Sequence, residues 1–476
     1  MVRVFGHHIS LRAVLFAIVE IAAFITFFNI SRALALYLVE GNYQGEIIGQ
    51  TFLLPLFCVI AFATASACGL YNREIRSDPN RIVMRLATVA VLMYFLMAAS
   101  ISLAEVFLVE GIDLKLYYAI TLAAAVGFFF TSLLFRHNAF AYNFNGTSLE
   151  QRILVIGVDE CAAKIEYLNG TSRSPYQAVG FVPIGGEEKS RRLSSYKILP
   201  GRLLEDPRAL IEQARYLRAD EIVVPSRERT GLPVESLMEC KLAGLTITEF
   251  SSFWERQTGQ IDLDAVSPSW LIFSEGFRTS WARTITKRAF DVIVALLVLI
   301  LTLPITLLTS IVIRIDSPGS IFYRQVRVGA DGRPFSILKF RSMRSDAEKD
   351  GVARWAQSND SRVTRVGKFL RRSRIDEIPQ IINVLIGDMS FVGPRPERPV
   401  FVDNLKQKIP YYDVRHRVKP GITGWAQINY PYGASDEDAK AKLAYDLYYV
   451  KNSNLFLDAV VLFQTARVVL WQEGAR

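Results

Sequence analysis

The N-terminal part of the chain alternates long apolar stretches with short polar links. Each stretch is close to the roughly 20 residues with which a helix crosses a bilayer. A cleaved signal peptide does not fit this pattern, because the first stretch is long and further stretches follow it at once. We therefore predict a transmembrane domain over residues 1–141, with four spans at residues 13–30, 47–70, 86–107 and 117–135.

The charges of the short links predict the orientation of these spans. The link after the second span is basic, with Arg73, Arg76, Arg81 and Arg85. The links after the first and third spans are mainly acidic, with Glu40, Glu46, Glu105, Glu110 and Asp113. Basic links stay on the cytoplasmic side, so we expect both ends of this domain in the cytoplasm. Within the first span, Glu20 is expected to pair inside the bundle.

Residues 142–265 alternate strand-like and helix-like patterns. The strand-like runs lie at residues 152–157, 221–225 and 245–250, and the helix-like runs at 160–168 and 206–216. We predict a Rossmann-like α/β domain here, followed by a linker at residues 266–283. The dinucleotide fingerprint is degenerate, since Asp159 stands where glycine is needed and its carboxylate would repel a pyrophosphate. A structural or regulatory role is therefore expected.

A further apolar run covers residues 289–313 and has Pro304 near its middle. Its length fits a fifth transmembrane helix. However, Lys287, Arg288 and Arg314 flank its ends, and a full crossing would deliver the most Arg-rich part of the chain to the outside. A helix broken at Pro304 that enters and leaves on the same face avoids this problem. We favour the hairpin, although these residues alone leave both arrangements open.

The composition supports a membrane protein, because 51% of the residues are hydrophobic and the mean hydropathy is +0.22. The net charge of +9 favours an anionic partner: nucleic acid, anionic lipid or a phosphorylated substrate. The apolar spans argue against nucleic acid. The four cysteines and four histidines show no metal-ligand spacing, so we expect neither a disulfide framework nor a zinc site. His416 is expected to be structural.

The stretch from Arg371 to Pro396 places an adjacent carboxylate pair, Asp376 and Glu377, among fixed positive charges. Because Pro379 has no amide hydrogen, a helix is expected to begin near Asp376 with Pro379 in its first turn. The arginines before and after the pair would attract a phosphorylated ligand through their guanidinium groups. The alternative is that Asp376 is an ordinary N-cap and the arginines form a solvated face. The pattern of charges does not decide between the two.

From Lys287 to Glu473 the chain carries an ordered series of motifs. They are Lys287-Arg-Ala-Phe-Asp291, Tyr323-Arg-Gln-Val-Arg-Val-Gly329, Leu338-Lys-Phe-Arg-Ser-Met343, Asn359-Asp-Ser-Arg362, Asp376-Glu-Ile-Pro-Gln380, Asn383-Val-Leu385, Gly387-Asp-Met-Ser390, Gly393-Pro-Arg-Pro396, Lys419-Pro-Gly-Ile-Thr-Gly424 and Asp446-Leu-Tyr-Tyr-Val-Lys451. This series resembles the bacterial sugar transferases known as polyprenyl-phosphate glycosyl-1-phosphate transferases, or phosphoglycosyl transferases, which start exopolysaccharide and O-antigen assembly. The predicted catalytic domain covers residues 284–476, and the whole layout resembles the large subclass of that family.

The resemblance implies a mainly α-helical, monotopic catalytic domain with a re-entrant membrane helix at residues 289–313, broken at Pro304. Leu303 stands where such enzymes often carry serine. The catalytic domain would face the cytoplasm at the bacterial cytoplasmic (inner) membrane. A homodimer is left open, and nucleic acid is not an expected partner.

The resemblance also implies the reaction. A sugar 1-phosphate would pass from a UDP-hexose, such as UDP-glucose or UDP-galactose, to undecaprenyl phosphate, with release of UMP. Asp376 would be the nucleophile that carries the covalent phosphosugar and Glu377 its partner, and Mg²⁺ would bind at the diphosphate with Asp376 as a ligand. The expected phosphate and uridine contacts are Lys339, Arg341, Arg371 and Arg395, and Pro394 and Pro396 would stiffen the loop that presents Arg395.

Two other functions compete with this one. A membrane-anchored nucleotide-sugar dehydratase or epimerase would use the middle domain, but it would need an intact glycine fingerprint and normally a Tyr-x-x-x-Lys pair, and neither is present there. A non-catalytic scaffold or regulator of polysaccharide assembly would not need the intact Asp376–Glu377 pair with its arginines.

Overall fold

The computed structural model describes residues 2–4, 7–9, 11–38, 47–71, 79–107, 114–141, 151–170, 176–185, 193, 197–225, 231–266, 268–274, 276–277, 280–344, 362–431, 433 and 435–471. The chain folds into two compact units. The first extends to Phe253, and the second begins at Trp254. Near the N-terminus, the short strands β1 (Val2–Val4) and β2 (His7–Ile9) pair with each other. The links whose charges predicted the orientation lie largely outside the described residues.

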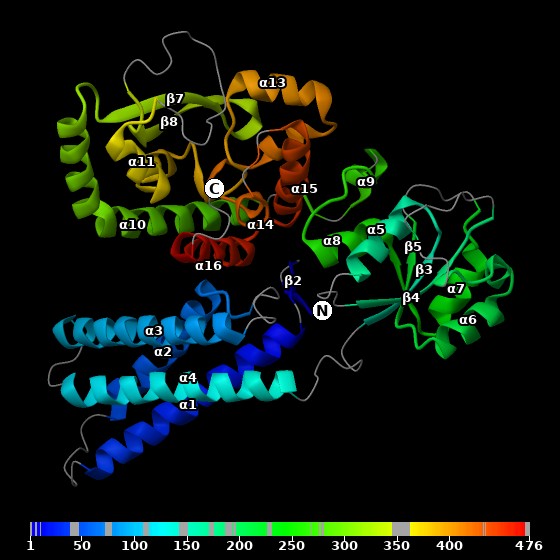
Figure 1. The fold of residues 1–476 in the computed structure, drawn as a ribbon, viewed down its shortest axis with the longest axis horizontal. Coiled ribbons are helices and arrows are strands. Elements are labelled where there is room, and N and C mark those ends of the chain that lie inside the picture. The colour runs from blue at the N-terminus through cyan, green and yellow to red at the C-terminus, as the bar shows by residue number, and fades with distance from the viewer. Residues whose placement is uncertain are drawn as a thin grey trace. The chain divides into compact units, whose positions relative to one another are not determined.

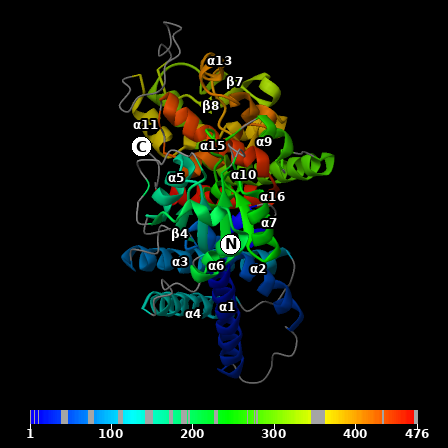
Figure 2. The same cartoon turned by 90° about the vertical axis from the view of Figure 1, so that its right-hand side faces the viewer.

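The N-terminal helices follow the predicted spans. They are α1 (Leu11–Leu38), α2 (Ile47–Ala67), α3 (Pro79–Phe107) and α4 (Leu114–Ala141). Helices α3 and α4 run alongside each other, and α1 packs against α4 at an oblique angle (Figures 1 and 2). By length and composition α1, α3 and α4 can cross a membrane, and the described apolar part of α2 is shorter, at Leu53–Ala67.

A buried ion pair joins the first and last of these helices. The Nε and Nη2 atoms of Arg136 donate to Glu20 Oε1 at 2.8 and 2.5 Å, and Nη1 donates to the carbonyl of Leu70 at 2.9 Å. Both side chains are buried, so each charge depends on the other. The expectation that Glu20 pairs inside the bundle is confirmed.

A four-stranded parallel sheet forms the rest of the first unit, with strand order β4-β3-β5-β6. Helix α5 lies on one side of the sheet, and α6 and α7 pack together on the other (Figure 1). The elements are β3 (Gln151–Ile156), α5 (Glu160–Asn169), β4 (Tyr176–Val182), the 3₁₀ turn η3 (Gly201–Leu204), α6 (Pro207–Tyr216), β5 (Glu221–Val224), α7 (Val234–Leu242) and β6 (Thr246–Glu249). The next helix, α8 (Phe250–Thr258), contains the boundary between the two units. The predicted α/β alternation is confirmed, and the Rossmann-like classification stays a prediction.

The turn after β3 explains why the dinucleotide fingerprint is degenerate. Asp159 is the N-cap of α5, and its Oδ1 atom accepts a hydrogen bond from the amide of Ala162 at 3.0 Å. The side chain therefore occupies the helix end that a pyrophosphate would need. All four cysteines carry free thiols.

Helix α10 (Trp281–Asp316) carries the apolar run of the second unit and contains Pro304. The assigned helix is unbroken, but it bends sharply (Figure 1). An internal proline removes one backbone hydrogen bond and favours such a kink. The helix is long and apolar enough to cross a membrane, and only 11% of its most apolar window is buried. Re-entry on the same face stays a prediction.

Both parts of α10 are attached to the rest of the second unit. Toward its start, the carboxylate of Asp291 accepts from Ser390 Oγ at 2.9 Å. Toward its end, the carbonyl of Ile313 accepts from Arg341 at 3.4 Å. A straight transmembrane helix would carry its far end away from the domain, so these contacts are those of a bent element that returns to it.

The remaining elements of the second unit surround a large core and a smaller cluster of Ile313, Phe340 and Leu370, and α12 packs on both α10 and β8. They are α9 (Pro268–Phe273), β7 (Phe322–Val328), η4 (Ala330–Gly332), β8 (Pro334–Phe340), α11 (Arg365–Arg372), η5 (Ile375–Glu377), α12 (Gln380–Ile386), β9 (Ser390–Val392), α13 (Pro399–Lys408), η6 (Tyr412–Arg417), β10 (Gly421–Thr423), α14 (Trp425–Asn429), α15 (Asp436–Asn452) and α16 (Leu455–Trp471). Strands β7 and β8 form an antiparallel hairpin, and β9 pairs with β10 in parallel. Helices predominate in this unit.

The chain segment after Phe253 belongs to the second unit. The carbonyl of Gly259 accepts from the indole of Trp425 at 2.6 Å, and Glu255 forms a 2.6 Å ion pair with Lys451. Residues 254–266 thus bind to the helices of the predicted catalytic domain.

Candidate active site

Strand β8 and helix α12 are joined by the side chain of Asn383. Its amide oxygen accepts from the backbone amide of Leu338 at 2.9 Å, and its amide nitrogen donates to the carbonyl of Ser336 at 2.8 Å. These two bonds bring Lys339 on β8 next to the turn that precedes α12. The motif beginning at Asn383 therefore has a structural purpose that its sequence did not reveal.

The carboxylate pair lies on the 3₁₀ turn η5, directly before α12. Arg374 enters this turn with a left-handed backbone, at φ 61°. Pro379 cannot donate to a carbonyl four residues earlier, and the amide of Ile378 bonds instead to Ile375 at 3.2 Å. The predicted helical start at Asp376 is confirmed, with the difference that its first turn is 3₁₀.

Glu377 is the centre of a cluster of cations. Its Oε1 atom lies 3.0 Å from Lys339 Nζ, 3.0 Å from Arg395 Nη2 and 3.8 Å from Arg374 Nη1. Burial alone would raise the pKa of Glu377, but the cations, first Lys339 and then Arg395, hold that pKa far below its usual range. Glu377 is therefore ionised and holds two of the predicted phosphate-binding side chains together.

Asp376 differs from its neighbour in having an unused oxygen. The residue is 7% exposed, and among the described residues its Oδ1 atom has no hydrogen-bond partner. Burial and the carboxylate of Glu377 raise the pKa of Asp376. Three cations offset part of that rise: Lys339, Arg371 and Arg374. The N-cap positions of η5 and α12 are Arg374 and Pro379, and neither makes a side-chain capping hydrogen bond. The N-cap alternative therefore does not describe Asp376.

Arg395 reaches Glu377 from the segment after β9. Gly393 begins that segment, and a side chain there would overlap with the carbonyl of Lys419. Pro394 and Pro396 flank Arg395 and are buried. The predicted loop thus presents Arg395 toward the carboxylate pair.

Arg341 and Arg371 lie differently from Lys339 and Arg395. Arg341 follows the end of β8 and donates to the carbonyls of Pro318 and Ser317, each at 2.7 Å, next to the end of α10. Its guanidinium therefore holds α10. Arg371 lies in the last turn of α11 and acts on the pKa of Asp376 through space. Substrate contacts by Arg341 and Arg371 stay predictions.

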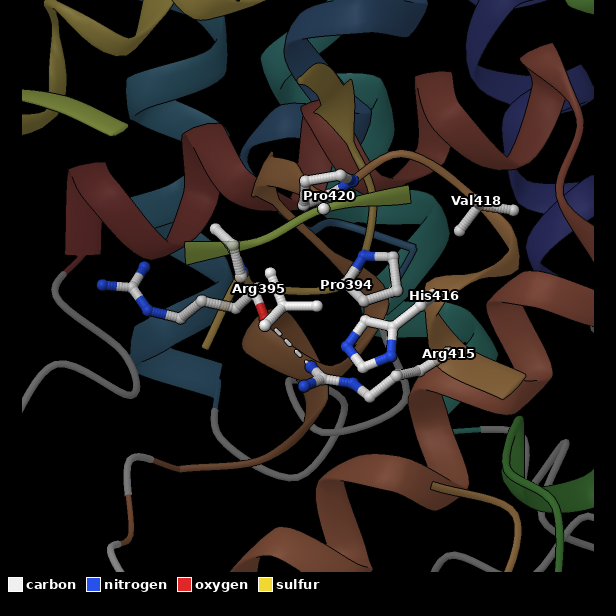
Figure 3. Close-up of a pocket in the computed structure, with 9 residues that line it drawn as sticks. Pro394, Arg395, Arg415, His416, Val418 and Pro420 are labelled. Carbon is white, nitrogen blue, oxygen red and sulfur yellow. Dashed lines mark hydrogen bonds between the residues drawn. The ribbon is translucent and has the colours of Figure 1, made fainter. Parts of the chain in front are cut away.

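A small pocket lies against the backbone of Arg395, beside Arg415 and His416 (Figure 3). The side chain of Arg395 points away from both of these residues. Burial and the charge of Arg415 lower the pKa of His416 to about 4. This histidine is therefore neutral and buried, which agrees with the structural role expected for it.

The candidate site fits a magnesium ion supplied with the substrate rather than one held in a protein cage. Within the described part of the chain, no three metal-ligating side chains form a cluster. The unpartnered Oδ1 atom of Asp376 is a hard anionic ligand. Mg²⁺ often binds through one or two carboxylates together with substrate phosphates. The donor set present at the site therefore suits that mode.

Comparison with known proteins identifies the family. The model of the family described as bacterial sugar transferase matches residues 282–472. A UDP-N-acetylgalactosamine-undecaprenyl-phosphate N-acetylgalactosaminephosphotransferase of Aeromonas hydrophila is 37% identical over 318 residues, which cover 66% of this chain and 72% of that protein. The chain belongs to the bacterial sugar transferase family. This finding confirms the resemblance drawn from the motifs, and the protein is an enzyme of this class.

Other relatives of this bacterial sugar transferase match a shorter part of the chain. A UDP-glucose:undecaprenyl-phosphate glucose-1-phosphate transferase of Escherichia coli (strain K12) is 44% identical over 188 residues, or 39% of this chain and 40% of that protein. An exopolysaccharide production protein of Rhizobium leguminosarum bv. phaseoli is 40% identical over 187 residues, or 38% of this chain and 93% of its own length. The chain thus aligns with less than half of the Escherichia coli protein.

Proposed function

We propose that this bacterial sugar transferase moves a sugar 1-phosphate from a UDP-sugar to undecaprenyl phosphate and releases UMP. The observation that carries the proposal is the unpaired, buried Oδ1 atom of Asp376 beside a carboxylate that two cations hold. A carboxylate attacks an anionic phosphorus only where nearby cations reduce the repulsion. Lys339 and Arg395 provide those cations.

In the first step, a carboxylate oxygen of Asp376 attacks the sugar-bearing phosphorus of the donor. The new oxygen–phosphorus bond forms as the bond from that phosphorus to the bridging oxygen breaks, and the electron pair leaves with UMP. Because Asp376 must be ionised to attack, the cations that lower its pKa also increase the fraction of reactive enzyme.

In the second step, a phosphate oxygen of undecaprenyl phosphate attacks the same phosphorus. The bond to Asp376 breaks, the carboxylate returns to its ionised form, and the product is undecaprenyl diphosphate-linked sugar. Dividing the reaction lets a water-soluble donor and a lipid acceptor use one site in turn. The product would be the first lipid-linked intermediate of exopolysaccharide or O-antigen assembly.

Mg²⁺ would be held by Asp376 and by the diphosphate oxygens of the donor. When bound, it would neutralise charge on the diphosphate. Lys339 and Arg395 would bind the same anionic group, and Arg371 and Arg374 would attract it. The cationic cluster thus orients the donor with its phosphorus toward Asp376.

The sugar is proposed as a hexose or an N-acetylhexosamine, because the relatives act on both kinds. Glucose and galactose are the hexoses suggested by the family resemblance, and the Aeromonas hydrophila relative is named for N-acetylgalactosamine. A panel of UDP-glucose, UDP-galactose and UDP-N-acetylgalactosamine would identify the donor.

The catalytic unit is proposed to lie on the cytoplasmic face of the inner membrane, held there by a re-entrant α10. The attachment of both parts of α10 to one domain supports re-entry. In a variant without the four native cysteines, single cysteines at Ile285 and Ile315 should react with an impermeant reagent from the same side. Reaction from opposite sides would refute the hairpin.

The reaction is tested with the purified full chain, Mg²⁺, undecaprenyl phosphate and the panel of UDP-sugars. Release of UMP that depends on both enzyme and donor is the expected result. Absence of UMP with every donor, from protein that is folded and membrane-inserted, would favour a non-catalytic scaffold instead.

A further inference from the structure

The backbone that presents Arg395 is held through its carbonyl groups. Pro394 and Pro396 have no amide hydrogen, so this short segment offers mainly acceptors. Four consecutive carbonyls are each hydrogen-bonded. In order from Pro394 to Glu397, the donors are the amide of Gly421 (3.0 Å), the guanidinium of Arg415 (3.0 Å), the guanidinium of Arg327 (3.1 Å) and the amide of Val328 (2.9 Å).

The donor to Arg395 itself is part of a buried charged network. Arg415 is 5% exposed, and its Nε and Nη2 atoms donate to Asp446 Oδ2 at 3.0 and 2.7 Å. Its Nη1 atom donates to the hydroxyl of Tyr412 at 2.9 Å. Every nitrogen of this guanidinium therefore has a partner, which leaves it little freedom to turn. Figure 3 shows Arg415 directed at the carbonyl of Arg395 while the Arg395 side chain leaves in the other direction.

We infer that Asp446 is a positioning residue for the proposed reaction: it orients Arg415, which holds the backbone of Arg395 and so places the Arg395 guanidinium against Glu377. Asp446 lies on α15, and Arg395 follows β9. The three links have distances of 2.7, 3.0 and 3.0 Å. The inference rests on the proposed function, because it assigns Asp446 a part in arranging the cations around the nucleophile.

Two physical arguments support this assignment over a purely stabilising role. An ion pair buried in a protein adds little net stability, because desolvation of the two charges offsets much of their attraction. A guanidinium that donates to two side chains, Asp446 and Tyr412, and also to one backbone carbonyl is, in contrast, an efficient way to fix that carbonyl. A displacement of about 1 Å in a catalytic group can cost on the order of 10²-fold in rate.

The first test is a double-mutant cycle on the donor half-reaction, measured as single-turnover UMP release. Asp446→Asn keeps the shape of the side chain and removes its charge, and we expect its rate constant to fall by roughly 10- to 100-fold with a smaller change in the donor concentration at half-saturation. In an Arg395→Met background, the same substitution should cause little further loss, since the residue through which it acts is gone. Equal losses in both backgrounds would overturn the inference.

The second test does not depend on activity. Hydrogen exchange of the amides of Val328 and Gly421, which donate to the same segment, should quicken in Asp446→Asn. Glu255→Gln is the matched control, because it neutralises another carboxylate of the same unit that is paired with a lysine, far along the chain from the segment. It should leave both amides and the rate of UMP release unchanged. Unchanged exchange in folded Asp446→Asn would overturn the inference even if the enzyme transfers sugar as proposed.

Tyr412→Phe covers the case in which Asp446→Asn does not fold. It removes only the hydroxyl that accepts from Arg415 Nη1. The same faster exchange and a smaller loss of rate, again absent in the Arg395→Met background, are expected. A loss of rate that persists in that background would refute the proposed chain of contacts. If wild-type protein releases no UMP but hydrogen exchange changes as expected, the proposed function is refuted, whereas the chain of contacts from Asp446 through Arg415 to Arg395 is supported.

Discussion

Two aspartates at the start of helices show how similar local sequences serve different ends. Asp159 precedes α5, and its Oδ1 atom accepts from the amide of Ala162. Asp376 precedes α12, and its Oδ1 atom is buried with no partner in the described structure. The difference arises from the backbone, because α5 offers unpaired amides to its cap, whereas Pro379 and the 3₁₀ turn leave none that Asp376 uses. A carboxylate that is not needed as a cap remains available for chemistry.

The surroundings strengthen this contrast. Asp159 sits where a nucleotide fingerprint would require glycine, and its charge is neutralised by the helix end. Asp376 sits beside Glu377, whose negative charge gathers Lys339 and Arg395. One carboxylate therefore closes a potential anion site, and the other lies within one.

The largest effect on activity is expected from replacing Asp376 with asparagine. Asp376→Asn removes the oxygen anion that is proposed to attack phosphorus and should lower UMP release by on the order of 10⁴-fold or more. Asp159→Asn is the matched control, since asparagine caps a helix as well as aspartate. Intact-protein mass spectrometry with donor alone should detect the phosphosugar adduct on wild type and on the control. Turnover that survives in Asp376→Asn would refute covalent catalysis at this residue.

An intermediate effect is expected in the pH dependence of the donor step. In the proposed mechanism Asp376 reacts only when it is ionised, and burial raises its pKa above the ordinary value of 3.8. The rate should therefore fall on acidification at a higher pH than an ordinary aspartate would give. Glu377 adds no such decline in the same range, because the cations hold its pKa far below its usual range.

Removing one cation tests the sign of this effect. Arg371 lowers the pKa of Asp376, so Arg371→Gln should move the acid limb of the pH–rate profile to higher pH. Arg372→Gln, at the exposed neighbouring position of α11, is the control. A limb that moves to lower pH in Arg371→Gln would contradict the electrostatic account of the site.

The smallest effect is expected from removing the cap. Asp159→Ala deletes the acceptor for Ala162 and should lower the stability of the middle domain by about 0.5–2 kcal/mol. UMP release should stay at the wild-type rate, because the cap lies outside the proposed chemistry. The stability is measured by chemical denaturation with a spectroscopic probe in the middle domain, and the activity is measured by UMP release. A large loss of activity would show that the two aspartates are not separable.

Much of this arrangement was predictable from the sequence, and the exceptions have physical causes. The length of the apolar runs located the N-terminal helices, and the charge pattern singled out Asp376 and Glu377. Strand β4 escaped because Gly180 interrupts its pattern, at a point where a side chain would approach Leu199 to 2.7 Å. Arg341 was grouped with Lys339 by its position in a matched motif and by its charge, but β8 ends at Phe340 and the backbone then turns Arg341 toward α10.

The nearer contacts of the site escaped for a related reason. Arg374 was not singled out among the arginines before the carboxylate pair. It has a left-handed backbone, which no glycine marks in the sequence, and it lies 3.8 Å from Glu377. Its positive charge near Asp376 and Glu377 could have placed it among the predicted phosphate contacts. Asn383 is different, because its role depends on which strand lies beside it, and that is decided by tertiary packing.

The amide of Asn383 has one more consequence. Accepting from Leu338 and donating to Ser336, it bonds to β8 as the peptide group of an adjacent strand would. The backbone groups of Ser336 and Leu338 that bond to Asn383 are thus not available to pair with another strand. This protects the edge of the hairpin from pairing with an extended segment of another chain. In Asn383→Asp an oxygen would face the carbonyl of Ser336, and the hairpin would become open to edge-to-edge aggregation.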